Sequence, residues 1–170
     1  KGKKIGLIGF GNVAQRVAEI AKGFNMQISV FSKSFESRKG NFLNIKSLSL
    51  EEMISTCDII SFHCKPPKDG NPIFNLPQLK KMKKNAVIIN TARGNLVNEE
   101  DLKEALENSM IRGAALDVFS NEPAKENILF GTKNLILTPH IAASTIEAQL
   151  VVAEQIAKQV SDFFNSGKVI

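Results

Sequence analysis

The sequence contains no tryptophan and no tyrosine, so its aromatic residues are 11 phenylalanines. Tryptophan and tyrosine side chains are therefore not available to stack on nucleic-acid bases. A net charge of +5 still raises the question of a nucleic-acid partner. The lysines are scattered, however, and their one dense group is LKKMKK at residues 79–84. Cations suit the end of a helix because the helix dipole is negative there, so we expect no nucleic-acid partner.

The sequence also lacks a long apolar run and a cysteine cluster. No stretch approaches the roughly 18 apolar residues of a spanning helix, so we expect no membrane span. The opening residues, KGKKIGLIGFG, show no small-residue cleavage signature, which disfavours a signal peptide. Cys57 and Cys64 lie seven residues apart, a spacing that matches no zinc motif. We expect both to be reduced, partly buried thiols in a cytoplasmic protein.

Apolar runs alternate with amphipathic stretches along the chain, which predicts strands alternating with helices. Continuous apolar strands joined through helices indicate a parallel sheet covered on both faces. We therefore predict an α/β fold, one doubly wound domain over residues 1–170 with at most seven strands. The expected strands are residues 4–9, 26–31, 58–64, 85–91, 111–119 and 134–140. The expected helices are residues 12–24, 98–110 and 144–167, with short ones near Ser49 and Pro77.

Helix faces and ends can be predicted from the same pattern. The first expected helix has one apolar face, formed by Val13, Val17, Ile20 and Ala21. Ser49 and Glu52 have the spacing of a capping box. Asn98 precedes three acids and is the expected N-cap of its helix. Gly167 is expected to end the last helix.

The segment GFGNVA, which begins at Gly9, follows the first expected strand and opens the first expected helix. This is the context that a dinucleotide-binding glycine loop requires. Gly9 permits the tight turn, and Gly11 leaves room for a pyrophosphate against the backbone. Free N–H groups of Asn12 and Val13 would point at its oxygens from the helix N-terminus. Ala14 replaces the third glycine, an accepted variant that serves helix-to-strand packing. The alternative is a glycine turn without a ligand.

The segment after the second expected strand bears on the choice of cofactor. An acid there accepts hydrogen bonds from the adenosine ribose and would repel a 2′-phosphate. No acid occurs in residues 28–35, which instead contain Ser32 and Lys33, and Arg38 and Lys39 follow. Hydroxyls and cations favour a 2′-phosphate, so we predict NADP in preference to NAD. The alternative is that these cations are ordinary exposed loop residues and that the chain binds NAD.

Four motifs occur in a fixed order, namely GLIGFGNVAQRVAEIAKGFNM, NTARGNLVNEEDLKEAL, GAALDVFSNEP and NLILTPHIAAST. Together they resemble the D-isomer-specific 2-hydroxyacid dehydrogenases, a family that includes glyoxylate/hydroxypyruvate reductases and D-3-phosphoglycerate dehydrogenase. The resemblance covers nearly the whole chain. It implies a Rossmann dinucleotide-binding fold and hydride transfer between NAD(P)H and a small 2-keto or 2-hydroxy acid.

The family's catalytic residues are an Arg, a Glu and a His, and the matching motifs place them at Arg93, Glu122 and His140. The resemblance implies that His140 supplies the proton for the new hydroxyl, because imidazole titrates near neutral pH. Glu122 would hydrogen-bond its other nitrogen. Arg93 would hold the substrate carboxylate and polarise the carbonyl. All three follow expected strands, at the edge where α/β sheets bind ligands. Taken singly, they could instead be a loop cation, a turn residue and a strand-end histidine.

Further cofactor contacts follow from the same resemblance. Asp117 resembles the residue that hydrogen-bonds the nicotinamide carboxamide. SFHC resembles the family segment beside the adenosine half of the cofactor, which implies contacts at Cys64 and at Lys65. The family has proline at the latter position, and a cation there could hold a phosphate or simply be exposed. We expect His63 to anchor its loop rather than to act in catalysis. The remaining implied contacts are Thr91, His140 and Ala142.

Two features narrow the reaction class. Formate dehydrogenases, which are similar in fold, pair the histidine with a Gln, whereas this chain has Glu122. Short-chain dehydrogenases need a Tyr-x-x-x-Lys, and this chain has no tyrosine. One alternative stays open, because dinucleotide-sensing transcriptional corepressors of the same fold also keep the catalytic trio. Turnover of a 2-keto acid by the full-length protein would separate the enzyme from the sensor.

Members of this family have two domains. The resemblance implies that this chain is the cofactor domain, with the split substrate domain absent. On this interpretation the chain binds cofactor but turns over substrate poorly or not at all. The resemblance also implies a homodimer for the full-length protein.

Overall fold

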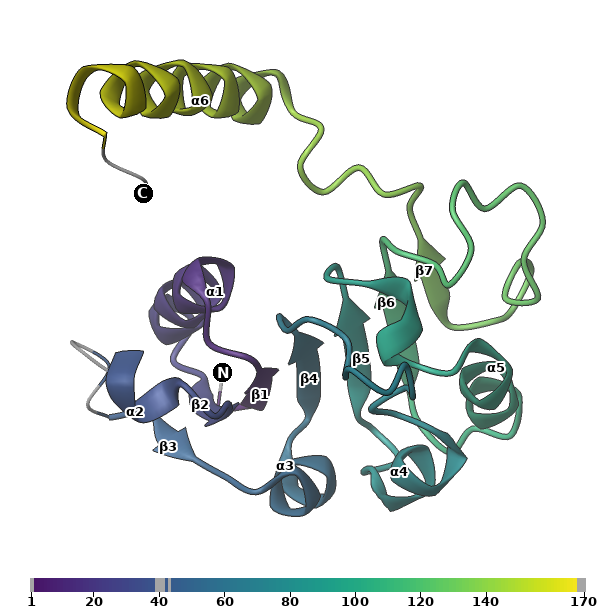
Figure 1. The fold of residues 1–170 in the computed structure, drawn as a ribbon. Helices are drawn as coiled ribbons and strands as arrows, with labels where there is room; N and C mark the ends of the chain where they lie inside the picture. Colours follow the sequence, from purple (N-terminus) through teal and green to yellow (C-terminus); the bar gives the residue numbers. More distant parts are fainter. Residues whose placement is uncertain (1, 39–41, 43, 168–170) are drawn as a thin grey trace. The chain divides into compact units, whose positions relative to one another are not determined.

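The computed structural model describes residues 2–38, 42 and 44–167. The chain forms two compact units, Lys1–Pro139 and His140–Ile170. The first unit contains a seven-stranded sheet with its helices, and the second contains one long helix (Figure 1).

The sheet has the strand order β3-β2-β1-β4-β5-β6-β7, and every neighbouring pair is parallel. The strands are β1 (Lys4–Ile8), β2 (Gln27–Phe31), β3 (Lys46–Ser47), β4 (Ile59–Phe62), β5 (Val87–Asn90), β6 (Gly113–Leu116) and β7 (Leu135–Leu137). The chain reverses its direction of winding between β1 and β4. Ligands of such sheets bind at this switch point, outside the carboxyl ends of the strands.

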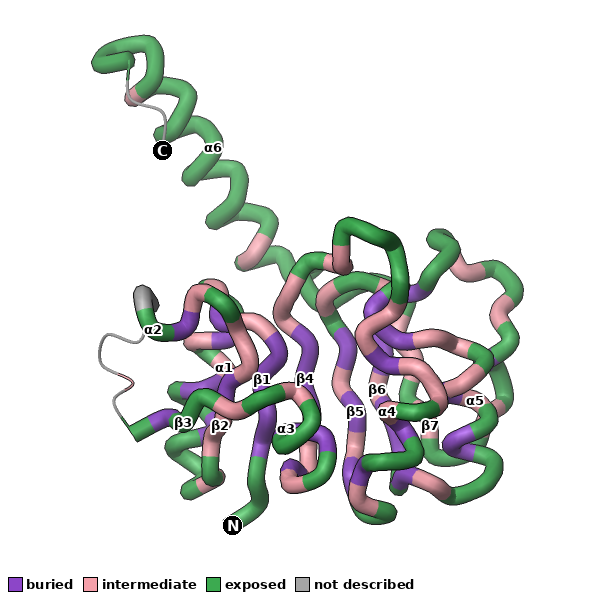
Figure 2. Tube along the Cα trace, turned by 60° about the horizontal axis from the view of Figure 1, so that its bottom comes forward, coloured by how far each residue is buried: buried purple, intermediate pink, exposed green. Residues whose placement is uncertain are grey.

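The helices of the first unit are α1 (Asn12–Gly23), α2 (Phe35–Arg38), α3 (Leu50–Thr56), α4 (Leu76–Lys81) and α5 (Glu99–Glu107), with a 3₁₀ turn, η1 (Gly94–Leu96). One hydrophobic cluster joins α3, α4 and α5 to the central strands, and a second joins α1 to β1 and β2. Figures 1 and 2 show α3, α4 and α5 grouped together, apart from α1. The predicted doubly wound α/β fold is confirmed.

Side chains of β1 alternate between these two clusters, as a strand covered on both faces requires. Ile5 and Leu7 belong to the α1 cluster, whereas Ile8 belongs to the cluster of α3–α5. A Cβ at Gly6 would lie 2.6 Å from Met53 Cγ, so the close packing of α3 depends on glycine at this position. Figure 2 shows that buried residues concentrate along the central strands.

The buried face of α1 differs from the predicted apolar face. The helix buries a row of small residues against the sheet, namely Ala14, Ala18 and Ala21. Val13 and Ile20 are 64% and 63% exposed, so their prediction on the packed face was wrong. Val17 is partly buried, and Ala21 is the one predicted member that is fully packed. Alanine lets a helix approach a sheet closely, and close packing here outweighs side-chain hydrophobicity.

The predicted starts of two helices, at Ser49 and at Asn98, are confirmed, whereas α5 ends at Glu107, three residues before its predicted end. Ser49 Oγ accepts a hydrogen bond from Glu52 N at 3.2 Å where α3 begins. Asn98 Oδ1 accepts one from Asp101 N at 3.0 Å at the start of α5. The lysines of LKKMKK lie in and just after the last turn of α4, where the helix dipole favours cations.

Two short elements were not predicted. β3 has two residues, both exposed, so its sequence shows no apolar strand pattern. It is a strand because it pairs with Ser29 and Val30 of β2. α2 has four residues and lies in the same polar stretch. Tertiary pairing rather than local sequence therefore creates this edge of the sheet.

The second unit contains α6 (Ile146–Ser166). Thr145 Oγ1 accepts a hydrogen bond from Ala148 N at 3.1 Å where the helix begins. The helix ends at Gly167, which has a left-handed φ of 68°, as the sequence predicts. None of its residues is buried, as Figure 2 shows along its length.

Within the described residues, no helix is both long and apolar enough for a membrane span.

Candidate functional site

A cavity of about 420 Å³ lies where three segments that follow strands meet at the carboxyl edge of the sheet. The segments are the glycine loop after β1, the residues after β4 and the residues after β5. The lining residues are Gly11, Asn12, Val13, Ala14, His63, Cys64, Lys65, Thr91, Ala92 and Arg93. The fold thus brings predicted cofactor contacts from three distant parts of the sequence to one place, together with Arg93.

The two glycines of the loop have different roles. Gly9 has a φ of +96°, and a Cβ there would lie 2.4 Å from the carbonyl oxygen of His63. Gly9 does not line the cavity, and its missing side chain allows the close contact with the segment that follows β4. Gly11 has an ordinary φ of −78°, and a Cβ there would meet nothing within 4 Å. The space that a side chain would take at Gly11 is open, as close approach of a ligand to the backbone requires.

The start of α1 is suited to an anion. Among the described residues, no side chain caps this helix and no acid lies in its first turn. The first N–H groups of a helix lack partners within the helix, and the helix dipole places partial positive charge beside them. Asn12 and Val13 carry such groups and both line the cavity.

His63 anchors the segment that follows β4. Its backbone N–H donates to Ile8 O at 2.8 Å, and its Nε2 lies 2.9 Å from Ser61 Oγ. Burial lowers the pKa of His63 to about 4, so the ring is neutral at neutral pH. This neutral, hydrogen-bonded ring agrees with the predicted anchoring role. The neighbouring Cys64 is a free thiol whose pKa is raised by burial, and Cys57 is also free.

Asn90 fixes the loop that carries Arg93. The Asn90 side chain is almost fully buried, with 1% of its surface exposed. Its Nδ2 donates to Arg93 O at 2.8 Å, and its Oδ1 accepts from Ala92 N at 3.1 Å. Arg93 itself is exposed at the cavity, so its backbone is held while its side chain remains on the surface. No local sequence pattern predicts this role of Asn90.

The loops of Arg93 and Glu122 lie against each other. A Cβ at Gly94 would fall 1.9 Å from the carbonyl atoms of Phe119, so these backbones are in direct contact. Glu122 Oε1 accepts a hydrogen bond from Phe119 N at 2.9 Å, which fixes the carboxylate within its own turn. Asp117 is buried at the end of β6, and its Oδ1 accepts a hydrogen bond from Thr138 Oγ1. Asp117 does not line the 420 Å³ cavity.

His140 and Ala142 belong to the second unit, where both are exposed. His140 follows Pro139 directly and has a left-handed φ of 55°. Arg93 thus lines the cavity of the first unit, and Glu122 lies in the loop that contacts the Arg93 loop. The catalytic roles of Arg93, Glu122 and His140 all stay predictions.

The SKS segment forms a turn after β2. Ser34 N donates to Ser32 Oγ at 3.3 Å, and Phe35 N donates to Ser32 O at 3.2 Å. Lys33 is exposed at the tip of this turn. Ser32 and Lys33 do not line the 420 Å³ cavity, so any contact with a cofactor is separate from it. Lys39 and the side chain of Arg38, both named for the same role, lie outside the described residues.

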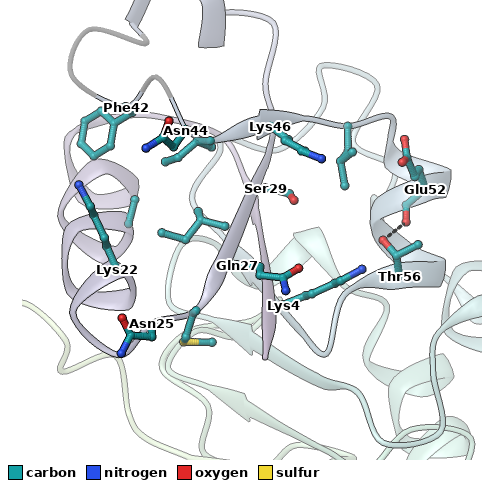
Figure 3. Close-up of a pocket in the computed structure, with 15 residues that line it drawn as sticks. Lys4, Lys22, Asn25, Gln27, Ser29, Phe42, Asn44, Lys46, Glu52 and Thr56 are labelled. Atoms are coloured by element: carbon teal, nitrogen blue, oxygen red, sulfur yellow. Dashed lines mark hydrogen bonds between the residues drawn. The ribbon is translucent and has the colours of Figure 1, made fainter. Parts of the chain in front are cut away.

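A second cavity of about 860 Å³ lies at the opposite edge of the sheet. Figure 3 shows Lys22 at the end of α1, Gln27 at the start of β2 and Thr56 at the end of α3 around it. This cavity adjoins the amino ends of β1 and β2, whereas parallel sheets bind ligands at their carboxyl ends. It contains none of the predicted site residues.

Three residues of the 420 Å³ cavity, Ala14, His63 and Ala92, were not among the predicted cofactor contacts. Each is a direct neighbour of a predicted contact in the sequence. Their positions follow from how the three segments meet, which no local pattern reveals.

Residues 1–142 match the family model described as D-isomer specific 2-hydroxyacid dehydrogenase, NAD binding domain. This chain belongs to that family. Because all neighbouring strands are parallel, the glycine loop, the NTARG loop and the loop after β6 occupy one edge of the sheet.

Individual relatives agree with the family assignment. The chain is 38% identical over 162 residues to D-3-phosphoglycerate dehydrogenase of Bacillus subtilis (strain 168), covering 95% of this chain and 31% of that protein. It is also 38% identical to glyoxylate reductase of Pyrococcus furiosus, covering 95% of this chain and 48% of that protein. An acyclic imino acid reductase, solved in complex with NADPH and D-Arg, superimposes with a TM-score of 0.88 at 36% identity. That superposition covers 99% of this chain and 53% of the reductase.

The chain therefore spans 31% to 53% of the length of these three relatives.

Proposed function

We propose that this chain is the dinucleotide-binding part of an NAD(P)-dependent D-2-hydroxyacid dehydrogenase, which interconverts a small 2-keto acid and its 2-hydroxy acid. The observation that carries the proposal is the cavity that joins the open backbone at Gly11 to Arg93 of the NTARG motif. Family membership and the names of the relatives, glyoxylate reductase and D-3-phosphoglycerate dehydrogenase, support the class of reaction.

The residues at the cavity fit a dinucleotide. The glycine loop leaves open the space that a side chain at Gly11 would fill. The N–H groups of Asn12 and Val13 would donate to the pyrophosphate, and Cys64 and Thr91 would line its path. When bound, the nicotinamide supplies or accepts the hydride.

Two residues of this chain would act on the substrate, and a third would act through one of them. Arg93 would bind the substrate carboxylate and polarise the carbonyl, since its fork of N–H donors matches a planar anion. His140 would give the proton to the carbonyl oxygen as the hydride arrives at carbon. Glu122 would orient the imidazole and stabilise its charged form. The fixed positions of the Arg93 and Glu122 loops support these roles, because catalytic groups must be held in place.

We propose NADP as the preferred cofactor. The turn at Ser32 and Lys33 offers hydroxyls and a cation and no acid, and a structural relative was solved with NADPH. The test is a fluorescence titration of NADH against NADPH with wild type and Ser32→Asp. The added carboxylate should shift the preference towards NADH. Tighter NADH binding by the wild type would overturn the preference.

The full-length protein tests the reaction itself. Glyoxylate and hydroxypyruvate should be reduced, with loss of NAD(P)H absorbance, and His140→Gln should lower kcat without weakening cofactor binding. Cofactor binding without turnover of any 2-keto acid would instead favour a dinucleotide sensor. The homodimer and the cytoplasmic location of the full-length protein stay predictions.

A further inference from the structure

One charged side chain at the 420 Å³ cavity, that of Lys65, has no role in the proposed mechanism. Among the described residues that line it, Lys65 and Arg93 are charged, and none is an acid. The N-terminus of α1 adds further positive potential. Arg93 is assigned to the substrate carboxylate. Lys65 is therefore available for a second anionic group in the same cavity.

The backbone before Lys65 is held against the glycine loop. His63 N–H donates to Ile8 O at 2.8 Å, and the His63 carbonyl lies where a Cβ of Gly9 would be. Lys65 follows two residues later and is succeeded by Pro66 and Pro67, whose rings restrict the backbone. The chain then turns, with Gly70 N–H donating to Pro67 O at 3.1 Å. The backbone segment that carries Lys65 is therefore held in place beside the glycine loop.

NAD and NADP share a pyrophosphate, and NADP carries an additional phosphate on its adenosine 2′-hydroxyl. The adenosine 2′-phosphate would lie by the turn after β2, where Ser32 and Lys33 are found. That turn does not contribute to the cavity, whereas Lys65 lines it together with Gly11 and Asn12. Those two residues mark the pyrophosphate position, because they form the N-terminus of α1.

We propose that Lys65 binds the pyrophosphate of the dinucleotide and raises the affinity for NAD and NADP alike. The proposal rests on the proposed function, since it requires a dinucleotide in this cavity. An ammonium group is a compact point charge that can neutralise either phosphate without a fixed geometry. Lys65 and Lys33 would then have separate effects, the first on both cofactors and the second on NADP alone.

The test compares Lys65→Ala, Lys33→Ala and Lys68→Ala in fluorescence titrations with NADH and NADPH. Lys68 is the matched control, because it is exposed on the same segment and does not line the cavity. Lys65→Ala should weaken both cofactors by roughly tenfold, the effect of losing one charge-assisted hydrogen bond. Lys33→Ala should weaken NADPH alone, Lys68→Ala should leave both unchanged, and Lys65→Arg should restore binding.

Further readouts separate electrostatics from shape. Inorganic pyrophosphate should compete with NADH for the wild type and compete less well for Lys65→Ala. Raising the salt concentration should weaken NADH binding more for the wild type than for Lys65→Ala, because a charge contact is screened. Circular dichroism should show an unchanged fold, since the lysine is exposed.

Each contrary result is informative. Equal NADH affinity for the wild type and Lys65→Ala would overturn the proposal. A loss confined to NADPH would also overturn it, by assigning Lys65 to the 2′-phosphate. Failure of the wild type to bind either cofactor would instead refute the proposed function, so the two failures are distinguishable.

Discussion

Replacing Gly11 with alanine should weaken dinucleotide binding strongly and leave the fold intact. The backbone at Gly11, with φ −78° and ψ −174°, is one that alanine adopts freely. The added methyl group would meet no protein atom within 4 Å. It would stand instead at the wall of the cavity, where a pyrophosphate must approach the backbone closely.

The expected magnitudes separate binding from folding. Alanine is a poorer N-cap than glycine by about 0.5–1 kcal/mol, and the lower entropy of the unfolded chain offsets roughly 0.4–1 kcal/mol. The free energy of unfolding should therefore change by less than about 1 kcal/mol. Two lost charge-assisted hydrogen bonds, at roughly 1.5 kcal/mol each or more, weaken binding at least about a hundredfold.

Two other glycines supply the controls. Gly9→Ala combines a left-handed φ of +96° with a 2.4 Å contact to a backbone carbonyl. It should therefore lower the free energy of unfolding by about 2–5 kcal/mol. Gly23→Ala, at the other end of α1, meets nothing within 4 Å and should leave binding unchanged.

The assay pairs NADH fluorescence titration with urea unfolding followed by far-ultraviolet circular dichroism. The chain has no tryptophan or tyrosine to overlap the cofactor signal. If Gly11→Ala bound NADH as tightly as the wild type while remaining folded, the open space at Gly11 would not be the pyrophosphate site.

Two further predictions concern His63 and Asn90, which hold the segments that line the cavity. Burial lowers the pKa of His63 to about 4, whereas the unfolded chain takes up this proton near pH 6.5. The free energy of unfolding should thus fall by at most about 3 kcal/mol between pH 6.5 and pH 4. Urea titrations of His63→Gln should show a flatter pH dependence, and parallel curves for the two proteins would contradict the assignment. Asn90→Asp keeps the acceptor for Ala92 N but loses the donor to Arg93 O, so urea unfolding should show a loss of about 1–3 kcal/mol. Unchanged stability would show that this buried amide does not hold the loop.

The sequence predicts the central fold well because its strands are continuous apolar runs between helix signals. The caps at Ser49 and Asn98 and the stop at Gly167 depend on local chemistry, so they too could be predicted. β3 could not, because its two residues form a strand only through pairing with β2. The packed face of α1 was misjudged because the sheet selects small side chains such as Ala18 rather than large apolar ones.

The candidate site shows the same division. The glycine loop has a local signature, and the cavity contains Gly11 and its neighbours as predicted. Asn90 has no such signature, since its importance comes from two hydrogen bonds within a buried loop. The assignment of Lys65 to the pyrophosphate side also needed the fold, because only the meeting of β1 and β4 places it beside Gly11.

An equilibrium titration of this chain with NADH and NADPH, followed by cofactor fluorescence, tests dinucleotide binding most directly. Both cofactors should bind saturably at one site, with NADPH tighter and with binding of both strongly weakened in Gly11→Ala. Absence of saturable binding of either dinucleotide to the folded wild-type chain would contradict the proposed function.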